Sequence, residues 1–191
     1  MTIKKNKIVI FTDLDGSILH RDTFKFDQIK DYIKKLINSG IHIIPNSSKT
    51  ESEIIEFNQD LGENLAYISE NGSVINNLNL LNSNFPNKII LSREKEELVE
   101  IFKNNVPENL QSKCKFISNL NKKDQINIFG LSETKLKNAL NRKYTEPFLF
   151  EGSKNEKKDL TKILTGNSLT IQEGGRVINP VSYTHLRAHE T

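Results

Sequence analysis

After a polar amino terminus, the chain shows a short apolar run that ends at a group of acidic and small residues. Residues Ile8–Phe11 are all apolar, whereas Thr12–Ser17 are polar or small except for Leu14. A short apolar run bounded by turn-forming residues is typical of a buried strand. We therefore expect Asp13 and Asp15 at the carboxyl end of a buried strand.

The next segment predicts a helix and a second strand. Apolar residues recur at helical spacing after Asp27, which we expect to cap the helix, and Gly40 is expected to end it. The strand Ile41–Ile44 follows, and this spacing favours a right-handed crossover between parallel strands. Thr50 and Glu53 have the spacing of a capping box, which predicts a second helix. The pattern indicates an α/β fold with a Rossmann-like parallel-sheet core.

The pattern changes after a third expected strand, Leu65–Ser69, and a hairpin that involves Val74–Leu81. From about Phe85, short helices and strands indicate an α+β unit. Its helices are expected at 94–105, 133–143 and 155–165, and its strands at 113–118, 125–129, 147–150, 168–172 and 176–178. We therefore expect an α/β core domain in residues 1–84 and an α+β cap domain in residues 85–180.

Residues 181–191 have neither a hydrophobic period nor turn signals. We interpret this segment as a non-native tail, and the alternative is a genuine flexible tail. It contains His185 and His189, two of the four histidines, so these residues give no support to a histidine-based site.

Composition narrows the range of functions. The 27 basic and 24 acidic residues are spread along the chain, and this distribution with few aromatic residues argues against a nucleic-acid-binding surface. The single cysteine, Cys114, excludes an intrachain disulfide and fits a reducing compartment. There is no apolar run long enough to span a membrane and no signal-like segment before the first strand. We expect a soluble, cytoplasmic protein without a membrane or nucleic-acid partner.

Asp13 and Asp15 are the candidate catalytic and metal-binding residues. Because side chains alternate along a strand, residues two apart can point the same way, toward the edge where α/β sheets bind ligands. Two neighbouring carboxylates call for a cation, and a hard ion such as Mg²⁺ fits oxygen ligands best. Gly16 allows a sharp turn after them. The alternative is a β-turn in which both carboxylates cap local amides.

The loop after the second strand contains Ser47, Ser48 and Lys49 and leads into the expected helix at Thr50. Free amides at a helix amino terminus suit a phosphate group. Ser47 is otherwise a loop or capping serine, and Lys49 either contacts an anionic substrate or is solvated.

These motifs resemble a known family. The order of residues Asp13–Ser17 after a strand resembles the first motif of the haloacid dehalogenase superfamily, with Ser17 where threonine is usual. The run Ser47–Thr50 is similar to the mannosyl-3-phosphoglycerate phosphatase family within it. Further matches are Glu70–Gly72, Glu146–Phe148 and Gly174–Arg176. Alone, the first of these is an Asn-Gly hairpin turn, and the last is a turn with a solvated arginine.

The resemblance implies a Mg²⁺-dependent phosphatase that converts mannosyl-3-phosphoglycerate to mannosylglycerate and phosphate through an aspartyl-phosphate. Asp13 is then the nucleophile and Asp15 the general acid and base. Mg²⁺ is bound by the carboxylate of Asp13 and the backbone carbonyl of Asp15. Phosphate or substrate is bound by Ser47, Ser48, Lys49, Glu70, Asn71 and Arg176, of which the arginine suits a glycerate carboxylate.

Relatives carry a motif lysine and a Gly-Asp segment that completes the Mg²⁺ site, whereas here the suspect tail follows Pro180. The resemblance therefore implies a truncated chain whose core sheet is incomplete at its carboxyl end, and which binds Mg²⁺ poorly and turns over little. The alternatives are a general sugar phosphatase, including one for a glucosyl analogue, a phosphomutase, and a non-catalytic binding domain.

Overall fold

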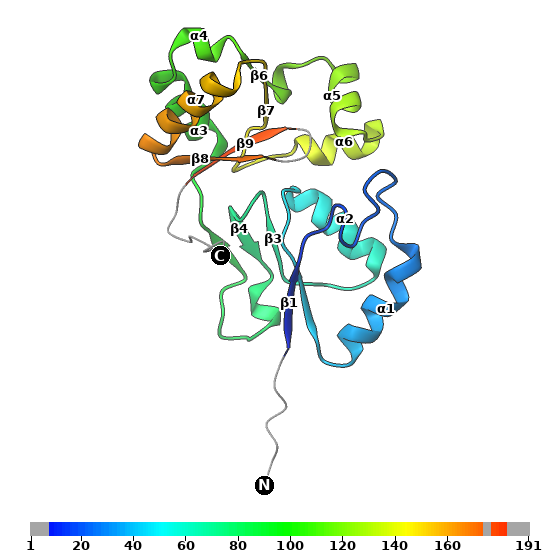
Figure 1. The fold of residues 1–191 in the computed structure, drawn as a ribbon. Coiled ribbons are helices and arrows are strands. Elements are labelled where there is room, and N and C mark those ends of the chain that lie inside the picture. Colours follow the sequence, from blue (N-terminus) through cyan, green and yellow to red (C-terminus); the bar gives the residue numbers. More distant parts are fainter. Residues whose placement is uncertain (1–7, 174–176, 183–191) are drawn as a thin grey trace. The chain divides into compact units, whose positions relative to one another are not determined.

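The computed structural model describes residues 8–173 and 177–182, and the chain forms two compact units that divide between Ile90 and Leu91. The sequence pattern predicts the change at residue 85, whereas residues 88–90 form a strand of unit 1. Figure 1 labels the elements of both units. The predicted α/β fold is confirmed.

Unit 1 begins with the expected parallel strand–helix–strand arrangement. Its elements are β1 (Val9–Thr12), α1 (Asp27–Asn38), β2 (His42–Pro45), α2 (Glu51–Leu61), β3 (Tyr67–Ser69), β4 (Val74–Asn76), η1 (Leu78–Leu80) and β5 (Lys88–Ile90). β1 pairs in parallel with β2, and an isolated parallel bridge joins Asn46 to Ile68 of β3. β3, β4 and β5 form an antiparallel sheet. The loops after β1, β2 and β3 therefore follow strand ends that lie next to one another.

Two helices build the core of unit 1, and Figure 1 shows them on the same side of its strands. The apolar face of α1 contributes Ile33 to a buried cluster that also includes Ile54 and Phe57 of α2. The capping box is confirmed, because Thr50 Oγ1 accepts from the amide of Glu53 at 3.2 Å while the Glu53 carboxylate accepts from the amide of Thr50 at 2.9 Å. The start of α2 is thus fixed directly beside the loop after β2.

The cap expected at Asp27 is not observed. Phe26 occupies the N-cap position of α1 without a side-chain hydrogen bond, and Asp27 is the first helical residue. A carboxylate in the first turn still stabilises the helix, since it lies near the positive end of the helix dipole.

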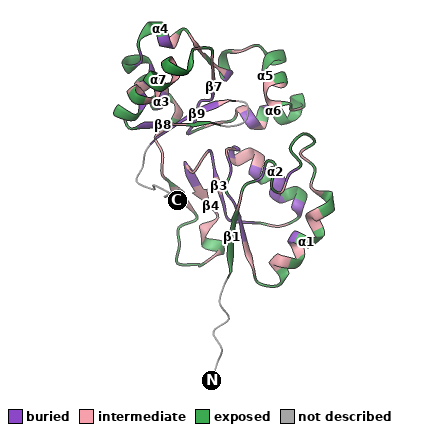
Figure 2. Ribbon diagram, in the orientation of Figure 1, coloured by how far each residue is buried: buried purple, intermediate pink, exposed green. Residues whose placement is uncertain are grey.

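The expectation of a buried first strand is wrong for the described residues. Ile8, Val9, Ile10 and Phe11 are all exposed, and none of them joins the core cluster of unit 1 (Figure 2). Among the described residues, β1 is paired on one side only, with β2. Its apolar sequence forms a strand, but the described elements around it are too few to cover it. The apolar pattern correctly predicted a strand and wrongly predicted its burial.

Unit 2 is the α+β part of the chain. Its elements are α3 (Lys95–Asn105), α4 (Glu108–Gln111), β6 (Cys114–Phe116), η2 (Ile117–Asn119), α5 (Lys122–Phe129), α6 (Glu133–Leu140), β7 (Phe148–Phe150), α7 (Lys154–Gly166), β8 (Leu169–Glu173) and β9 (Ile178–Ser182). The strands form an antiparallel sheet in the order β6-β7-β9-β8. Phe102 of α3 packs against Phe116 and Phe148 of this sheet, with ring centroids 5.1 and 5.9 Å away.

The strand expected at residues 125–129 is a helix, α5. Asn121 caps it, with its side chain accepting from the amide of Asp124 at 3.0 Å, and Gly130 ends it with φ +67°. The buried Gln125 also faces inward, where its amide donates to the carbonyl of Ile117 at 2.9 Å. These local contacts stabilise a helix where a strand was expected.

β9 includes Val181 and Ser182, the first residues of the expected tail, and residues 183–191 lie outside the described part. No helix among the residues that the structure describes is long and apolar enough to cross a membrane.

Candidate active site

The turn after β1 carries both predicted catalytic carboxylates. β1 ends at Thr12, so Asp13 and Asp15 belong to a turn rather than to the strand. Leu14 between them is fully buried, and its carbonyl accepts from the amide of Leu19 at 2.7 Å. Gly16 has φ +80°, a conformation that favours glycine. The turn, and not strand alternation, therefore sets where the two carboxylates point.

Asp13 is an exposed residue that directly follows β1. Its Oδ1 accepts a hydrogen bond from the amide of Leu14 at 2.7 Å. The described residues provide no ion pair to Asp13. A solvent-accessible carboxylate without a cationic partner is suited to hold a hard cation or to approach an electrophile.

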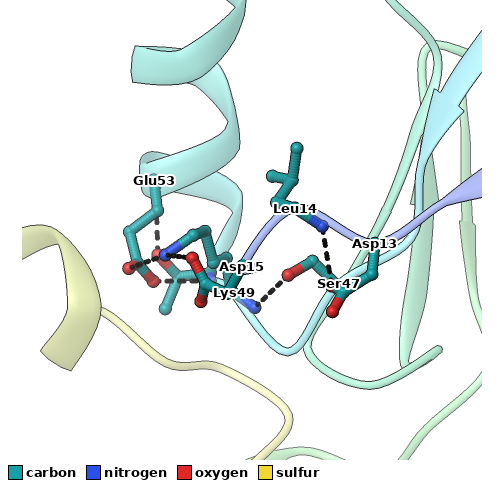
Figure 3. A network of polar contacts seen from close by, with 7 residues as sticks. Asp13, Leu14, Asp15, Ser47, Lys49 and Glu53 are labelled. Carbon is teal, nitrogen blue, oxygen red and sulfur yellow. Dashed lines mark hydrogen bonds and ion pairs between the residues drawn. The ribbon is translucent and has the colours of Figure 1, made fainter. Parts of the chain in front are cut away.

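Asp15 is held by a network that Figure 3 shows from close by. Its Oδ1 lies 3.0 Å from Lys49 Nζ, and the same ammonium lies 3.6 Å from Glu53 Oε1 and 5.1 Å from the ring centre of Phe24. The Lys49 side chain is only 10 % exposed, which contradicts the alternative that Lys49 is a solvated surface lysine. Because a cation already lies against Asp15 Oδ1, Asp13 is the better carboxylate ligand for a metal ion.

The loop after β2 lies beside this turn, since the amide of Asn46 donates to the carbonyl of Thr12 at 2.8 Å. Ser47 is buried, and its hydroxyl accepts from the amide of Lys49 at 3.4 Å. Ser48 follows it and is half-buried. Ser47, Ser48 and Lys49 thus come together with Asp15 on neighbouring loops of unit 1.

The loop between β3 and β4 joins the same region. The amide of Glu70 donates to the carbonyl of Lys49 at 2.8 Å, and that of Asn71 donates to the carbonyl of Ser47 at 3.1 Å. Glu70 and Asn71 have φ of +49° and +60°, which is uncommon for residues other than glycine. Asn71 Nδ2 is buried and has no partner among the described residues. Strained backbone with an unpaired donor is typical of a ligand-binding loop.

Glu146 and Arg176, which are also matched to the family, belong by sequence to unit 2. Arg176 falls outside the described residues. Glu146 is buried in unit 2, with its carboxylate 3.7 Å from Lys95 Nζ. The sequence analysis did not predict that Phe24 and Glu53 contact Lys49 in the Asp15 network. The i,i+4 spacing of Lys49 and Glu53 was a signal for one of them.

Comparisons with known proteins identify the family and the fold of this chain. The family model of haloacid dehalogenase-like hydrolases matches residues 10–173. The chain belongs to this family. Among solved structures of the haloacid dehalogenase superfamily, a phosphatase from Bacteroides thetaiotaomicron has the same fold, with a TM-score of 0.63 at 15 % identity, covering 97 % of this chain and 70 % of the other.

Curated relatives of this haloacid dehalogenase-like chain are named after a specific phosphatase activity. A protein of Persephonella marina is 27 % identical over 88 % of this chain, and one of Methanococcoides burtonii is 27 % identical over 89 %. Both are named glucosyl-3-phosphoglycerate/mannosyl-3-phosphoglycerate phosphatase, in line with the predicted resemblance. The chain spans 64 % and 65 % of the length of these two relatives.

Proposed function

We propose that the protein is a Mg²⁺-dependent phosphatase that hydrolyses mannosyl-3-phosphoglycerate, or its glucosyl analogue, to the hexosylglycerate and phosphate. The observation that carries the proposal is the unequal state of the two carboxylates on one turn. Asp13 is exposed and free of ion pairs among the described residues, whereas Asp15 is held by Lys49. Two carboxylates in different environments are suited to different roles in one reaction.

In the first half-reaction, a carboxylate oxygen of Asp13 attacks the phosphorus atom, and the bond from phosphorus to the glycerate oxygen breaks. Asp15 donates a proton to the departing oxygen. In the second half-reaction, Asp15 takes a proton from water, which attacks the phosphorus of the aspartyl-phosphate and releases Asp13. One turn therefore supplies both the nucleophile and the acid and base.

The surrounding loops would hold the phosphoryl group. Ser47 and Ser48 on the loop before α2, and Asn71 Nδ2 on the loop between β3 and β4, supply neutral donors close to the turn. Arg176 stays the predicted partner of the glycerate carboxylate.

Mg²⁺ fits the donors that are present, namely the Asp13 carboxylate and the Asp15 backbone carbonyl. Bound there, the ion would offset the repulsion between the carboxylate and the phosphate. Among the described residues, no three His, Cys, Asp or Glu side chains gather as a metal site, so this fit covers only part of a coordination shell. We further propose a cytoplasmic role in the synthesis of mannosylglycerate.

The test is phosphate release by the full-length protein and its Asp13→Asn variant, with Mg²⁺ and with EDTA. We expect the variant and the EDTA sample to lose at least about a thousandfold in kcat, because each lacks a group that the transition state requires. Asp31→Asn, an exposed aspartate of α1, is the matched control and should keep full activity. Activity retained by Asp13→Asn would contradict the nucleophile assignment.

A panel of substrates separates this proposal from a general sugar phosphatase. Hexosyl-3-phosphoglycerates should give the highest kcat/KM, with glucose 6-phosphate and mannose 6-phosphate at least about tenfold lower, since they lack the glycerate carboxylate. Equal kcat/KM across the panel would favour the general enzyme.

A further inference from the structure

Lys49 is a buried cation of the candidate site, and its contacts are unusual for a residue expected to bind substrate. Its ammonium lies 3.0 Å from Asp15 Oδ1 and 3.6 Å from Glu53 Oε1, and 5.1 Å from the centre of the Phe24 ring. A buried charge is stable only when it is paired. The two carboxylates and the ring face supply that pairing from three different segments of unit 1.

The partners of Lys49 are themselves fixed. The other oxygen of the Glu53 carboxylate accepts from the amide of Thr50 at 2.9 Å in the capping box, so this side chain cannot swing away without breaking the start of α2. Phe24 has φ +57° in the loop before α1, and its amide donates to the carbonyl of His20 at 2.8 Å. Lys49 is thus held at a set position between two anchored groups.

This arrangement has a consequence for Asp15. A lysine ammonium only donates hydrogen bonds, so it occupies Oδ1 of Asp15 as an acceptor. The Asp15 side chain is 37 % exposed, and the structure describes no ion pair to its other oxygen, Oδ2. The carboxyl group is therefore anchored through one oxygen and presents the other. Lys49, with two carboxylates around one ammonium, retains no surplus positive charge for a phosphate group.

We propose that Lys49 is a positioning residue, which anchors Asp15 through Oδ1 so that Oδ2 exchanges the proton with the leaving oxygen and with water. Glu53 holds Lys49 in place for this purpose. The inference rests on the proposed phosphatase function and deepens it, since it moves Lys49 from the predicted substrate-binding residues to the group that orients the acid and base.

The test compares two substrates of different leaving groups in the full-length protein. The glycerate oxygen of a sugar-glycerate phosphate must be protonated as it departs. The nitrophenolate that leaves p-nitrophenyl phosphate is a weaker base and depends far less on a proton donor. The ratio kcat/KM reports the phosphorylation of Asp13 and not the later attack by water. For Lys49→Met we expect kcat/KM to fall about ten- to hundredfold on the first substrate and less than about threefold on the second. Combined with Asp15→Asn, the substitution should cause no further loss, because both act on one group.

Two further variants keep the result interpretable. Glu53→Gln retains the capping-box geometry and removes the charge beside Lys49, so it should reproduce the same selective loss at smaller size. Lys88→Met is the matched control, since Lys88 Nζ forms an ion pair of the same 3.0 Å length with Glu51 and has no part in the site. It should leave kcat/KM unchanged on both substrates.

Other outcomes overturn the inference. Equal losses of kcat/KM on both substrates would overturn the inference, because a residue that binds the phosphate or only supports the fold acts on both substrates alike. The melting temperatures of Lys49→Met, Asp15→Asn and the double variant give a readout that needs no activity. Additive shifts would refute the ion pair itself. A wild type without hydrolysis but with non-additive shifts would refute the proposed function and the catalytic part of the inference, leaving only the contact.

Discussion

Cys114 allows a test of burial at a single atom. Its thiol donates a hydrogen bond to the carbonyl of Leu110 at 3.4 Å, and burial raises its pKa to about 12. The thiolate is the form that reacts with alkylating reagents. At about pH 8.5 we expect iodoacetamide to label the folded protein on the order of a hundredfold more slowly than the protein in urea, measured by intact mass. As it is the single cysteine, the mass shift reports this site alone. Equal rates would show that the thiol is accessible and ionises normally.

At this scale the sequence revealed residue types better than residue contacts. Asp13 and Asp15 could be selected because their spacing after an apolar run is local information. The contact between Asp15 and Lys49 joins two loops that are far apart in sequence, and no pattern along the chain encodes the rotamer that brings the ammonium to the carboxylate. The sequence therefore identified Lys49 as a site residue and left its partner open.

At the scale of elements, the capping box of α2 is both a structural and a functional support. Thr50 is fully buried, and its Oγ1 accepts from the amide of Glu53. Thr50→Ala should lower the free energy of unfolding by about 1 kcal/mol, because an amide at the helix start loses its acceptor. Urea unfolding followed by circular dichroism measures this. Thr50→Ser keeps the hydroxyl and should lose much less; a similar loss would assign the effect to packing of the methyl group.

A second capping box, at the start of α7, makes stability depend on pH. Hydrogen bonds from the Lys113 side chain, and then from the amide and hydroxyl of Ser153, lower the pKa of Glu156 to about 2. Because this pKa is depressed in the folded state, the stabilisation is present above about pH 4.5 and is lost as the pH falls toward about 2. The difference in unfolding free energy between the wild type and Glu156→Gln should therefore shrink over this range in urea titrations.

Lys113→Met is the control for this assignment. It removes the first cause of the shift, so most of the pH dependence that Glu156 contributes should disappear in this background. If the difference in unfolding free energy between the wild type and Glu156→Gln stayed constant from about pH 6 to about pH 2.5, this result would contradict the lowered pKa of Glu156.

Element types were predictable where the local signals agreed. The crossover from β1 to β2 combined an apolar run, a helical period and a second apolar run, and the structure has all three elements. For α5, the alternating residues favoured a strand while Asn121 and Gly130 favoured a helix, and the capping contacts prevailed. A short segment with conflicting signals is decided by contacts that its own pattern does not contain.

For the whole molecule, the sequence pattern identified the fold class but could not reveal which strands are buried. The residues of β1 are as apolar as those of a buried parallel strand. Within the part of the chain that the structure describes, however, β1 pairs with β2 alone, and Val9, Ile10 and Phe11 are exposed. Burial depends on which segments pack around a strand, and composition within the strand carries no information on them.

This exposure predicts that the 191-residue chain associates through β1. A strand with an unpaired edge and apolar side chains is a template for pairing with another chain, and a charge on such an edge prevents it. Sedimentation velocity over a range of concentrations should therefore show oligomers for the wild type and a monomer for Phe11→Lys. Phe11 is 61 % exposed, and Tyr32 on α1, at 63 %, is the matched apolar residue away from any strand edge. Tyr32→Lys should associate like the wild type. If instead it abolishes association while Phe11→Lys does not, the apolar face of α1 and not the edge of β1 is the contact surface.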